Sequence, residues 1–306
     1  MNDRRSAPSS KSVKKNDGGP ISFSALEKFS ENDLDAWKRL SRRLTSFNNE
    51  LYSSLHTQRR LIYEKLLAAL YEGSCRQFEF TDWWRIVDEL YSSHPLDPKG
   101  STLWVGGRFN FGQRINSLEF NPFPALYLAG DHESAFCEKF QIDKAGRNGL
   151  KDNEIAFNPD RCFTTYRVAL KMNRVFDLRN KNSLDKFASL IAGFRVPQEV
   201  KKSALALRIS KIPLARSSSM IMRSVFHKKW QTLPAQFGLP SNSQILGKML
   251  RDAKYEGILY RSVRTKRLCM AVFTENLEAD SYVEVIGETS ANVKVKKIDS
   301  GFLKWL

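Results

Sequence analysis

An arginine that directly follows two glycines is the first candidate for chemistry. The stretch Trp104-Val-Gly-Gly-Arg-Phe-Asn110 places Gly106 and Gly107 immediately before Arg108. Glycine lets the backbone turn sharply or approach a ligand closely, and a planar guanidinium can fork onto a phosphate or pyrophosphate. The pattern therefore indicates an anion-binding arginine, and the alternative is a surface arginine paired with a carboxylate.

Two further candidate residues are a tyrosine in an apolar run and a glutamate on a predicted helix. Tyr127 lies in the strand-like run Pro124-Ala-Leu-Tyr-Leu-Ala129, where it is either a substrate contact or a half-buried core residue with a bonded hydroxyl. Glu138 lies on the helix predicted over Glu133–Phe140. If that helix turns Glu138 toward a cleft, the carboxylate is partly desolvated. Otherwise Glu138 is a solvated residue of the helix surface.

A serine follows a second glycine-containing turn. The stretch Lys254-Tyr-Glu-Gly-Ile-Leu-Tyr-Arg-Ser262 predicts a turn at Gly257 and a strand that ends at Ser262. Because Arg261 and Arg264 flank it, Ser262 could donate a hydrogen bond to a phosphate. The alternative is a serine that forms a turn.

Signatures of other chemistries are absent from the sequence. It contains no GxxxxGK[ST], GxGxxG, GxSxG or HExxH motif, which disfavours a Walker loop, a dinucleotide fold, a nucleophile elbow and a zinc protease. The four histidines and four cysteines are dispersed, and no CxxC pair occurs. We therefore expect no metal site and no disulfide framework, and this cysteine usage suits a reducing cytoplasm.

Taken together, the segments resemble the RES domain, a family named for an Arg, a Glu and a Ser. Its Gly-Gly-Arg-aromatic-Asn turn is matched by Gly106–Asn110, and its Tyr-Leu-Ala strand by Tyr127–Ala129. Its Ala-x-x-Glu helix is matched by Ala135–Glu138, and its late strand by Gly257–Ser262. The segments occur in the family's order, with Thr164–Leu178 between them. The resemblance spans about 78–273.

The resemblance implies a fold related to ADP-ribosyltransferases and cleavage of the nicotinamide–ribose bond of NAD. The acceptor would be phosphate, as in an NAD phosphorylase, or water, as in an NAD glycohydrolase. Glu138 would stabilise the positive charge that develops on the ribose. Arg108 and Ser262 would hold the pyrophosphate or an attacking phosphate, and Tyr127 would contact the substrate. NAD is then a substrate, and no prosthetic group or metal is required.

Four further residues are expected to bind the substrate. Arg85, in the stretch Trp83-Trp-Arg-Ile-Val, resembles an early arginine of the family and is a candidate for anion binding. Gly107, Asn110 and Arg261 adjoin the predicted catalytic residues.

The resemblance also has implications for partners and some departures from the family pattern. Many members are toxins of bacterial toxin-antitoxin pairs, so it implies a toxin held inactive by an antitoxin or another acidic inhibitory protein. Phe109 stands where the family usually has Trp, and Phe111–Phe123 resembles an inserted loop. The oligomeric state is left open.

Around these residues the sequence predicts an α+β fold with mixed or antiparallel sheets. Residues 1–20 are polar and predict a disordered tail, 21–74 predict a helical extension broken near Asn48 and Asn49, and 75–306 predict the catalytic domain. Strands are predicted over Thr102–Val105, Ala125–Ala129, Thr164–Leu170, Arg174–Leu178, Gly257–Tyr260, Leu268–Phe273 and Ser281–Ile286. Further helices are predicted over Glu133–Phe140, Ser183–Ala192 and Gln244–Ala253.

The charge pattern leaves other functions open. The formal net charge is +16, and no Asp or Glu occurs between Val200 and Arg251. We expect this basic stretch to be a solvated surface or a docking face for an acidic protein rather than a specific nucleic-acid site, and binding of an anionic small ligand is a further alternative. One rival function is ADP-ribosyl transfer to a macromolecule. Another is a non-catalytic nucleic-acid-binding or interaction protein. No apolar run is long enough for a membrane span, and no signal-peptide core is evident.

Overall fold

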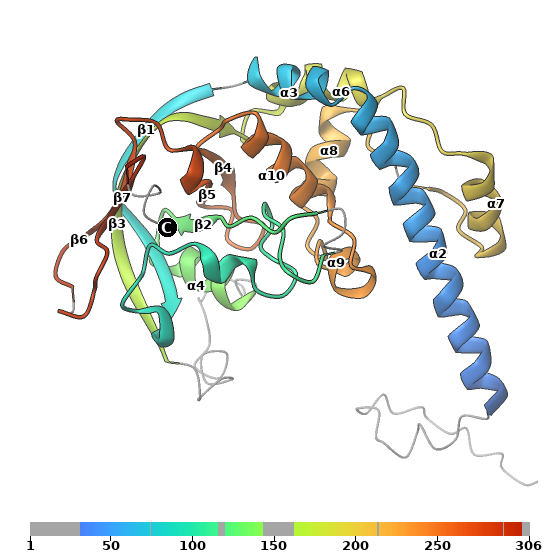
Figure 1. The fold of residues 1–306 in the computed structure, drawn as a ribbon, viewed down its shortest axis with the longest axis horizontal. Helices are drawn as coiled ribbons and strands as arrows, with labels where there is room; N and C mark the ends of the chain where they lie inside the picture. The colour runs from blue at the N-terminus through green and yellow to red at the C-terminus, as the bar shows by residue number, and fades with distance from the viewer. Residues whose placement is uncertain are drawn as a thin grey trace, which may run out of the picture. The chain divides into compact units, whose positions relative to one another are not determined.

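The computed structural model describes residues 31–73, 75–115, 120–142, 162–212, 214–289 and 291–301 (Figure 1). Contacts along the chain divide it into two units, Met1–Leu44 and Thr45–Leu306. The tail predicted over 1–20 lies outside the described residues, and the predicted domain boundaries stay predictions. None of the helices in the described ranges combines the length and the apolarity that a membrane span requires.

Two helices begin the described chain, as the sequence predicted. They are α2 (Glu31–Leu61) and α3 (Tyr63–Tyr71). The break predicted near Asn48 is wrong, because α2 continues through it and ends only at Leu61. Phe47 and Leu51, one helical turn apart, pack into the same small apolar cluster. That packing outweighs the low helix propensity of asparagine.

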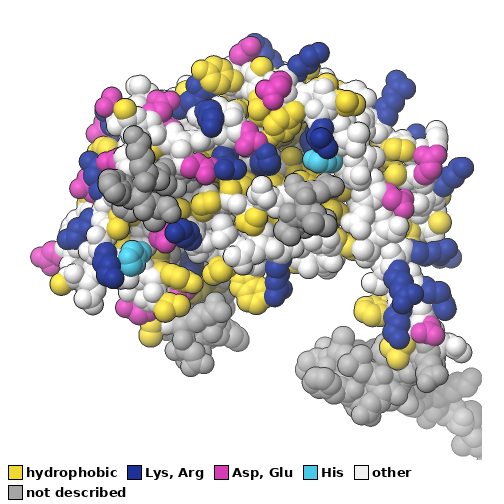
Figure 2. Space-filling model, in the orientation of Figure 1, with side chains coloured by type: hydrophobic (Ala, Val, Ile, Leu, Met, Phe, Trp, Pro, Cys, Tyr) yellow, Lys and Arg dark blue, Asp and Glu magenta, His cyan; other side chains and the backbone are white. Residues whose placement is uncertain are grey.

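The first half of α2 is exposed and basic. Its four cations Lys38, Arg39, Arg42 and Arg43 are all exposed, and Figure 2 shows dark-blue side chains gathered over this part of the helix. Trp37 is 67% exposed, and Leu34 and Leu40 are exposed as well. These apolar side chains are therefore not buried in the first half of the helix.

A seven-stranded mixed sheet forms the body of the second unit, in the order β1-β2-β5-β4-β3-β6-β7. The strands are β1 (Cys75–Asp88), β2 (Leu126–Ala129), β3 (Phe163–Asp177), β4 (Gly257–Arg261), β5 (Leu268–Val272), β6 (Tyr282–Ile286) and β7 (Lys297–Asp299). Because β1 pairs with both β2 and β3, five strands close on themselves like a barrel, and β6 and β7 extend from β3. The pairing of β3 with β4 is parallel, and the other pairings are antiparallel.

Most predicted strands are confirmed, but two predictions are corrected. Thr164–Leu170 and Arg174–Leu178 form one strand, β3, because the carboxylate of Glu256 accepts hydrogen bonds from the backbone N–H groups of Asn173 and Arg174, both at 2.6 Å. These contacts satisfy the backbone donors where we predicted a break. Thr102–Val105 is not a strand. Its first residue ends a 3₁₀ turn, and the remainder is an irregular turn.

Helices cover the closed part of the sheet. They are α4 (His132–Phe140), α6 (Asp185–Ile191), α7 (Gln198–Ala206), α8 (Ser218–Val225), α9 (Thr232–Phe237) and α10 (Asn242–Asp252), with 3₁₀ turns at Glu89–Tyr91, Lys99–Thr102, Lys181–Leu184 and Thr274–Asn276. The sequence predicted α4, α6 and α10 but not the short helices between Gln198 and Phe237. In Figure 1, α3, α6, α8 and α10 gather on one side of the sheet, and they contact one another.

Both faces of the central strands are buried. On β4, Ile258 faces the apolar cluster that includes the helices, and its neighbour Leu259 faces a second cluster formed by the strands. Met270 and Ala271 alternate in the same way on β5, as the period of two in a strand requires. The fold is α+β, as predicted.

Candidate functional site

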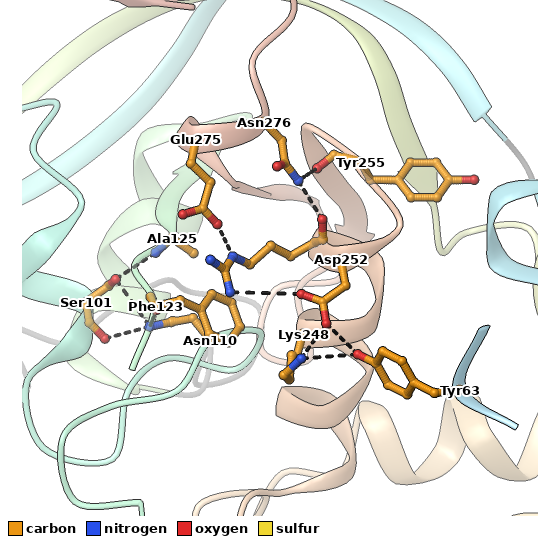
Figure 3. A network of polar contacts seen from close by, with 11 residues as sticks. Tyr63, Ser101, Asn110, Phe123, Ala125, Lys248, Asp252, Tyr255, Glu275 and Asn276 are labelled. Carbon is orange, nitrogen blue, oxygen red and sulfur yellow. Dashed lines mark hydrogen bonds and ion pairs between the residues drawn. The ribbon is translucent and has the colours of Figure 1, made fainter. Parts of the chain in front are cut away.

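Hydrogen bonds around Asn110 hold the turn that carries Arg108. The backbone N–H of Gly107 donates to Asn110 Oδ1 at 3.0 Å, and Asn110 Nδ2 donates to the carbonyl oxygens of Ser101 at 2.9 Å and Phe123 at 3.0 Å. Figure 3 shows Asn110 facing Ser101. The Asn110 side chain is fully buried, so water does not compete for these bonds. The asparagine predicted as a substrate contact thus holds the backbone of the turn.

Tyr127 supports the same turn from β2. Its hydroxyl donates to Asn110 Oδ1 at 2.8 Å and accepts from the Phe109 backbone N–H at 2.9 Å. Burial raises the pKa of Tyr127, so the hydroxyl keeps its proton and both bonds. A Cβ on Gly107 would lie 2.4 Å from Tyr127 Oη, and Gly106 has a φ of +85°. Both glycines are therefore required by this packing.

Helix α10 holds the turn from the other side, through a residue that the sequence analysis did not single out. The side-chain Nε2 of Gln244, a fully buried residue, donates to the carbonyl oxygens of Val105 at 2.7 Å, Asn110 at 2.9 Å and Gly107 at 3.1 Å. Its Oε1 accepts from the Ser241 backbone N–H at 3.0 Å in a capping box. The Ser-x-x-Gln pattern predicts that cap, but no sequence signal predicts the contacts with the turn.

Close backbone packing completes this support. A Cβ added to Gly247 would lie 2.1 Å from the Phe109 carbonyl oxygen. Glycine therefore lets α10 approach the turn directly beside Arg108. The Phe109 ring packs edge-on against Tyr260 of β4, with 5.0 Å between ring centroids. Phe109 is thus a fully buried core contact.

Arg108 itself is 7% exposed. Its Nη1 donates to the carbonyl oxygen of Val225, the last residue of α8, at 3.0 Å and to that of His227, two residues further on, at 3.2 Å. Its guanidinium carbon lies 5.5 Å from the centre of the Trp230 ring. Burial lowers the pKa of Arg108, and the nearby Tyr260 and Glu138 oppose that effect. A buried cation without a full carboxylate pair is suited to an anionic ligand.

Glu138 and Ser262 are joined by a direct hydrogen bond. Ser262 Oγ donates to Glu138 Oε1 at 2.6 Å. Ser262 Oγ also accepts hydrogen bonds from the backbone N–H groups of Arg264 and Thr265, both at 3.0 Å. The single hydroxyl proton of Ser262 therefore points at the Glu138 carboxylate. Ser262 is 1% exposed. The serine predicted to hold a phosphate therefore orients Glu138, which lies near the end of α4.

The tertiary structure brings the four predicted catalytic residues to one place. The charge of Glu138 acts on the pKa values of both Arg108 and Tyr127. Burial raises the pKa of Tyr260 and of the Cys269 thiol, and Glu138 is also among the groups that raise each. These two groups are therefore neutral neighbours of Glu138. The candidate site thus combines the Arg108 guanidinium and the Glu138 carboxylate, with the cation Arg264 nearby, in a largely buried aromatic setting.

The other two residues predicted to bind the substrate, Arg85 and Arg261, bond to backbone carbonyl oxygens. The Arg85 guanidinium donates to three carbonyl oxygens, those of Pro95, of Asp97 at 3.1 Å and of Tyr127 at 3.2 Å. Burial lowers the pKa of Arg85 to about 10. These contacts favour a role in positioning β2, and its anion-binding role stays a prediction. Arg261 is exposed at the end of β4 and donates to the Lys266 carbonyl oxygen at 3.2 Å.

A second polar network fixes the far end of α10 (Figure 3). Asp252 accepts from Tyr63 of α3 and from Lys248, whose Nζ lies 3.1 Å from the Tyr63 hydroxyl. Arg251 pairs with Glu275 and lies over the Phe123 ring at 4.7 Å. Because side-chain contacts hold both ends of α10, the helix is a rigid support for the Arg108 turn.

Within the described ranges, no group of three or more His, Cys, Asp or Glu side chains is placed to hold a metal ion.

The chain was compared with known protein families, curated proteins and solved structures. No curated protein matches the chain. Among solved structures, one that resembles it is the MbcT-MbcA toxin-antitoxin complex of M. tuberculosis, at 12% identity and a TM-score of 0.42, covering 77% of this chain and 92% of that one. The family model of the RES domain matches residues 82–293, a range that contains the Arg108 turn, Glu138 and Ser262. The chain belongs to the RES domain family.

Proposed function

We propose that this protein degrades NAD by cleaving the bond between nicotinamide and ribose. The observation that carries the proposal is the pairing of Glu138 with Ser262 at 2.6 Å beside the buried guanidinium of Arg108, inside a RES domain. A carboxylate and a cation so placed match a substrate that joins a pyrophosphate to a ribose on which positive charge develops.

In this proposal Glu138 is the residue that acts on the reacting centre. As the glycosidic bond breaks, its electron pair leaves with nicotinamide, and the ribose gains oxocarbenium character. The ionised carboxylate stabilises that charge because it is oriented before the reaction starts. Ser262 occupies Oε1, and we assign Oε2 to the ribose.

Arg108 binds the anionic part of the substrate. Its Nη1 is directed at two carbonyl oxygens, which orient the guanidinium so that its other N–H groups can meet a pyrophosphate or an attacking phosphate. Tyr127 and Asn110 act through the turn and are positioning residues. This differs from the direct substrate contacts that the sequence suggested for them.

The acceptor is phosphate or water. With phosphate, one of its oxygens bonds to the anomeric carbon and the product is ADP-ribose 1-phosphate. With water, the product is ADP-ribose and a proton is released. Incubation of the pure protein with NAD, with and without phosphate, followed by mass spectrometry of the products, tests the proposal. Nicotinamide release supports it, and intact NAD under both conditions would overturn it.

We also propose that the protein is a toxin that acts in the cytoplasm. Membership in the RES domain family supports a toxin that depletes NAD and that an antitoxin or another acidic protein inhibits. Induced expression in bacteria should lower cellular NAD and stop growth. The Glu138→Gln variant at an equal protein level should do neither. Equal toxicity of the two proteins would contradict the role proposed for NAD cleavage.

A further inference from the structure

A large cavity lies away from the candidate site, between the second half of α2, helix α7 and the segment 209–216. Its volume is about 1110 Å³, which exceeds the usual 300–1,000 Å³ of small-molecule pockets. Its apolar lining includes Val196, Ala204, Ile209, Ile212 and Leu214. These residues also form most of a small apolar cluster with Phe47. The cavity therefore has an apolar floor that continues into packed structure.

Charges of one sign surround that floor. The lining contains the cations Arg195, Lys201, Lys211 and Arg216, and it contains no Asp or Glu. All four are exposed, and in the described part of the chain none of them forms an ion pair. Leu205, on the same rim, is 73% exposed. An apolar surface left open beside unpaired like charges is typical of a docking site.

We propose that this cavity, which we call the α2–α7 pocket, binds an acidic amphipathic segment of a partner protein. Apolar side chains of the segment would cover the floor and Leu205, and its carboxylates would face the cationic rim. This is the arrangement of a helix that lays its apolar face into a groove. The proposal does not depend on NAD chemistry, since the pocket shares no lining residue with the candidate site.

Other occupants fit the lining less well. A small anion is held by buried, convergent donors, whereas these cations are exposed on the rim. Single-stranded nucleic acid stacks its bases on aromatic side chains, and no lining residue is aromatic. Residues 1–30 of this chain hold six Lys or Arg against three Asp or Glu, so they carry the same sign as the rim. An acidic segment of another protein is the occupant whose charge complements the pocket.

A synthetic peptide probe tests the proposal with the full chain. The probe is a fluorescein-labelled helix of about 15 residues with Leu at positions i, i+3, i+4 and i+7 and Glu elsewhere. Fluorescence anisotropy should show saturable binding with a Kd on the order of 10 μM at about 0.15 M salt. Matched probes replace every Leu by Gln or every Glu by Lys, and both should bind at least about tenfold more weakly.

Variants locate the binding. Lys201→Glu and Leu205→Ser should each weaken it about fivefold or more. Lys202→Glu changes the neighbouring exposed residue of α7 by the same charge but lies outside the lining, and Leu90→Ser removes another exposed leucine. Both controls should leave the Kd unchanged within about twofold.

Several results would overturn the proposal. They are no binding up to about 1 mM probe, equal losses for Lys201→Glu and Lys202→Glu, or equal binding of the probe that lacks Leu. A single-stranded oligonucleotide of about 15 nucleotides that binds more tightly and is weakened by Lys201→Glu would assign the pocket to nucleic acid instead.

Discussion

Ser262 Oγ lies 2.6 Å from Glu138 Oε1, although 124 positions separate the two residues in the chain. The contact joins the end of β4 to helix α4. Through it, Ser262 orients the Glu138 carboxylate. Because backbone N–H groups of the 262–265 turn bind the same hydroxyl, the serine cannot rotate away without losing three bonds. Predictions about catalysis start from this pair.

Replacing Glu138 by Gln should remove most NAD cleavage while the protein stays folded. The amide keeps an acceptor for Ser262 but loses the charge that stabilises the ribose, which costs about 3 kcal/mol or roughly a hundredfold in kcat. Initial rates of nicotinamide release measure the effect. Glu79→Gln, the same exchange at an exposed position of β1, is the control. Wild-type turnover in a folded Glu138→Gln protein would refute the assignment.

Ser262→Ala should lower kcat about tenfold, since a hydrogen bond to a charged group is lost. If the serine acts only through Glu138, adding Ser262→Ala to Glu138→Gln should cause little further loss. The rates of the two single variants and the double variant decide this. Strictly additive losses would indicate that Ser262 acts on the substrate independently of Glu138, as the resemblance first suggested.

Gln244→Glu should destabilise the protein. A carboxylate cannot donate to the three carbonyl oxygens that Gln244 now satisfies, and the cost is about 3 kcal/mol, or a fall in Tm of about 6–10 °C for a chain of this size. Thermal unfolding followed by circular dichroism measures it. Gln236→Glu, the same exchange at an exposed position of α9, should leave Tm unchanged. Equal Tm values for the two variants would show that the buried amide does not hold the turn.

Gly247→Ala should displace the Arg108 turn. The added methyl would lie 2.1 Å from the Phe109 carbonyl oxygen, so α10 or the turn must shift, at a cost of about 2 kcal/mol or more. Both Tm and NAD turnover should fall. Gly193→Ala is the matched control, because a Cβ there meets no atom within 4 Å. A neutral Gly247→Ala variant would contradict the close packing.

Low pH should reduce the folding stability of the protein, and protonation of Asp177 should account for part of the loss. Burial raises the pKa of this carboxyl, but hydrogen bonds and the charge of Arg179 outweigh burial, so the pKa lies below its ordinary value of 3.8. A lowered folded-state pKa stabilises the protein above about pH 4, and that contribution is lost as the pH falls through the folded pKa. Asp177→Asn should therefore lower Tm at pH 7, and the difference from wild type should shrink below pH 4. Asp82→Asn, which breaks an exposed pair with Arg167, should show no such trend.

Local sequence patterns predicted much of the fold, and the resemblance to the RES domain selected the candidate site residues among them. Glycines before Arg108, the Ala-x-x-Glu helix and the strand ending at Ser262 each follow from short-range preferences of the backbone. The same preferences predicted α4 and α10 and the strands β2, β4, β5 and β6. Such features are readable because neighbouring residues determine them.

Long-range packing decided the rest. The α2 helix crosses Asn48 because Phe47 and Leu51 share one buried cluster, and β3 crosses Asn173 because Glu256 supplies the missing acceptor. The cluster around Phe47 and Leu51 also contains the distant Val196 and Val200, and Glu256 lies 83 positions from Asn173, so no short window of residues contains the cause. The role of Gln244 and the pairing of Ser262 with Glu138 depend in the same way on contacts between distant segments. Sequence determined which groups are available, and the tertiary structure decided which of them meet, because hydrogen bonds and burial act through space and not along the chain.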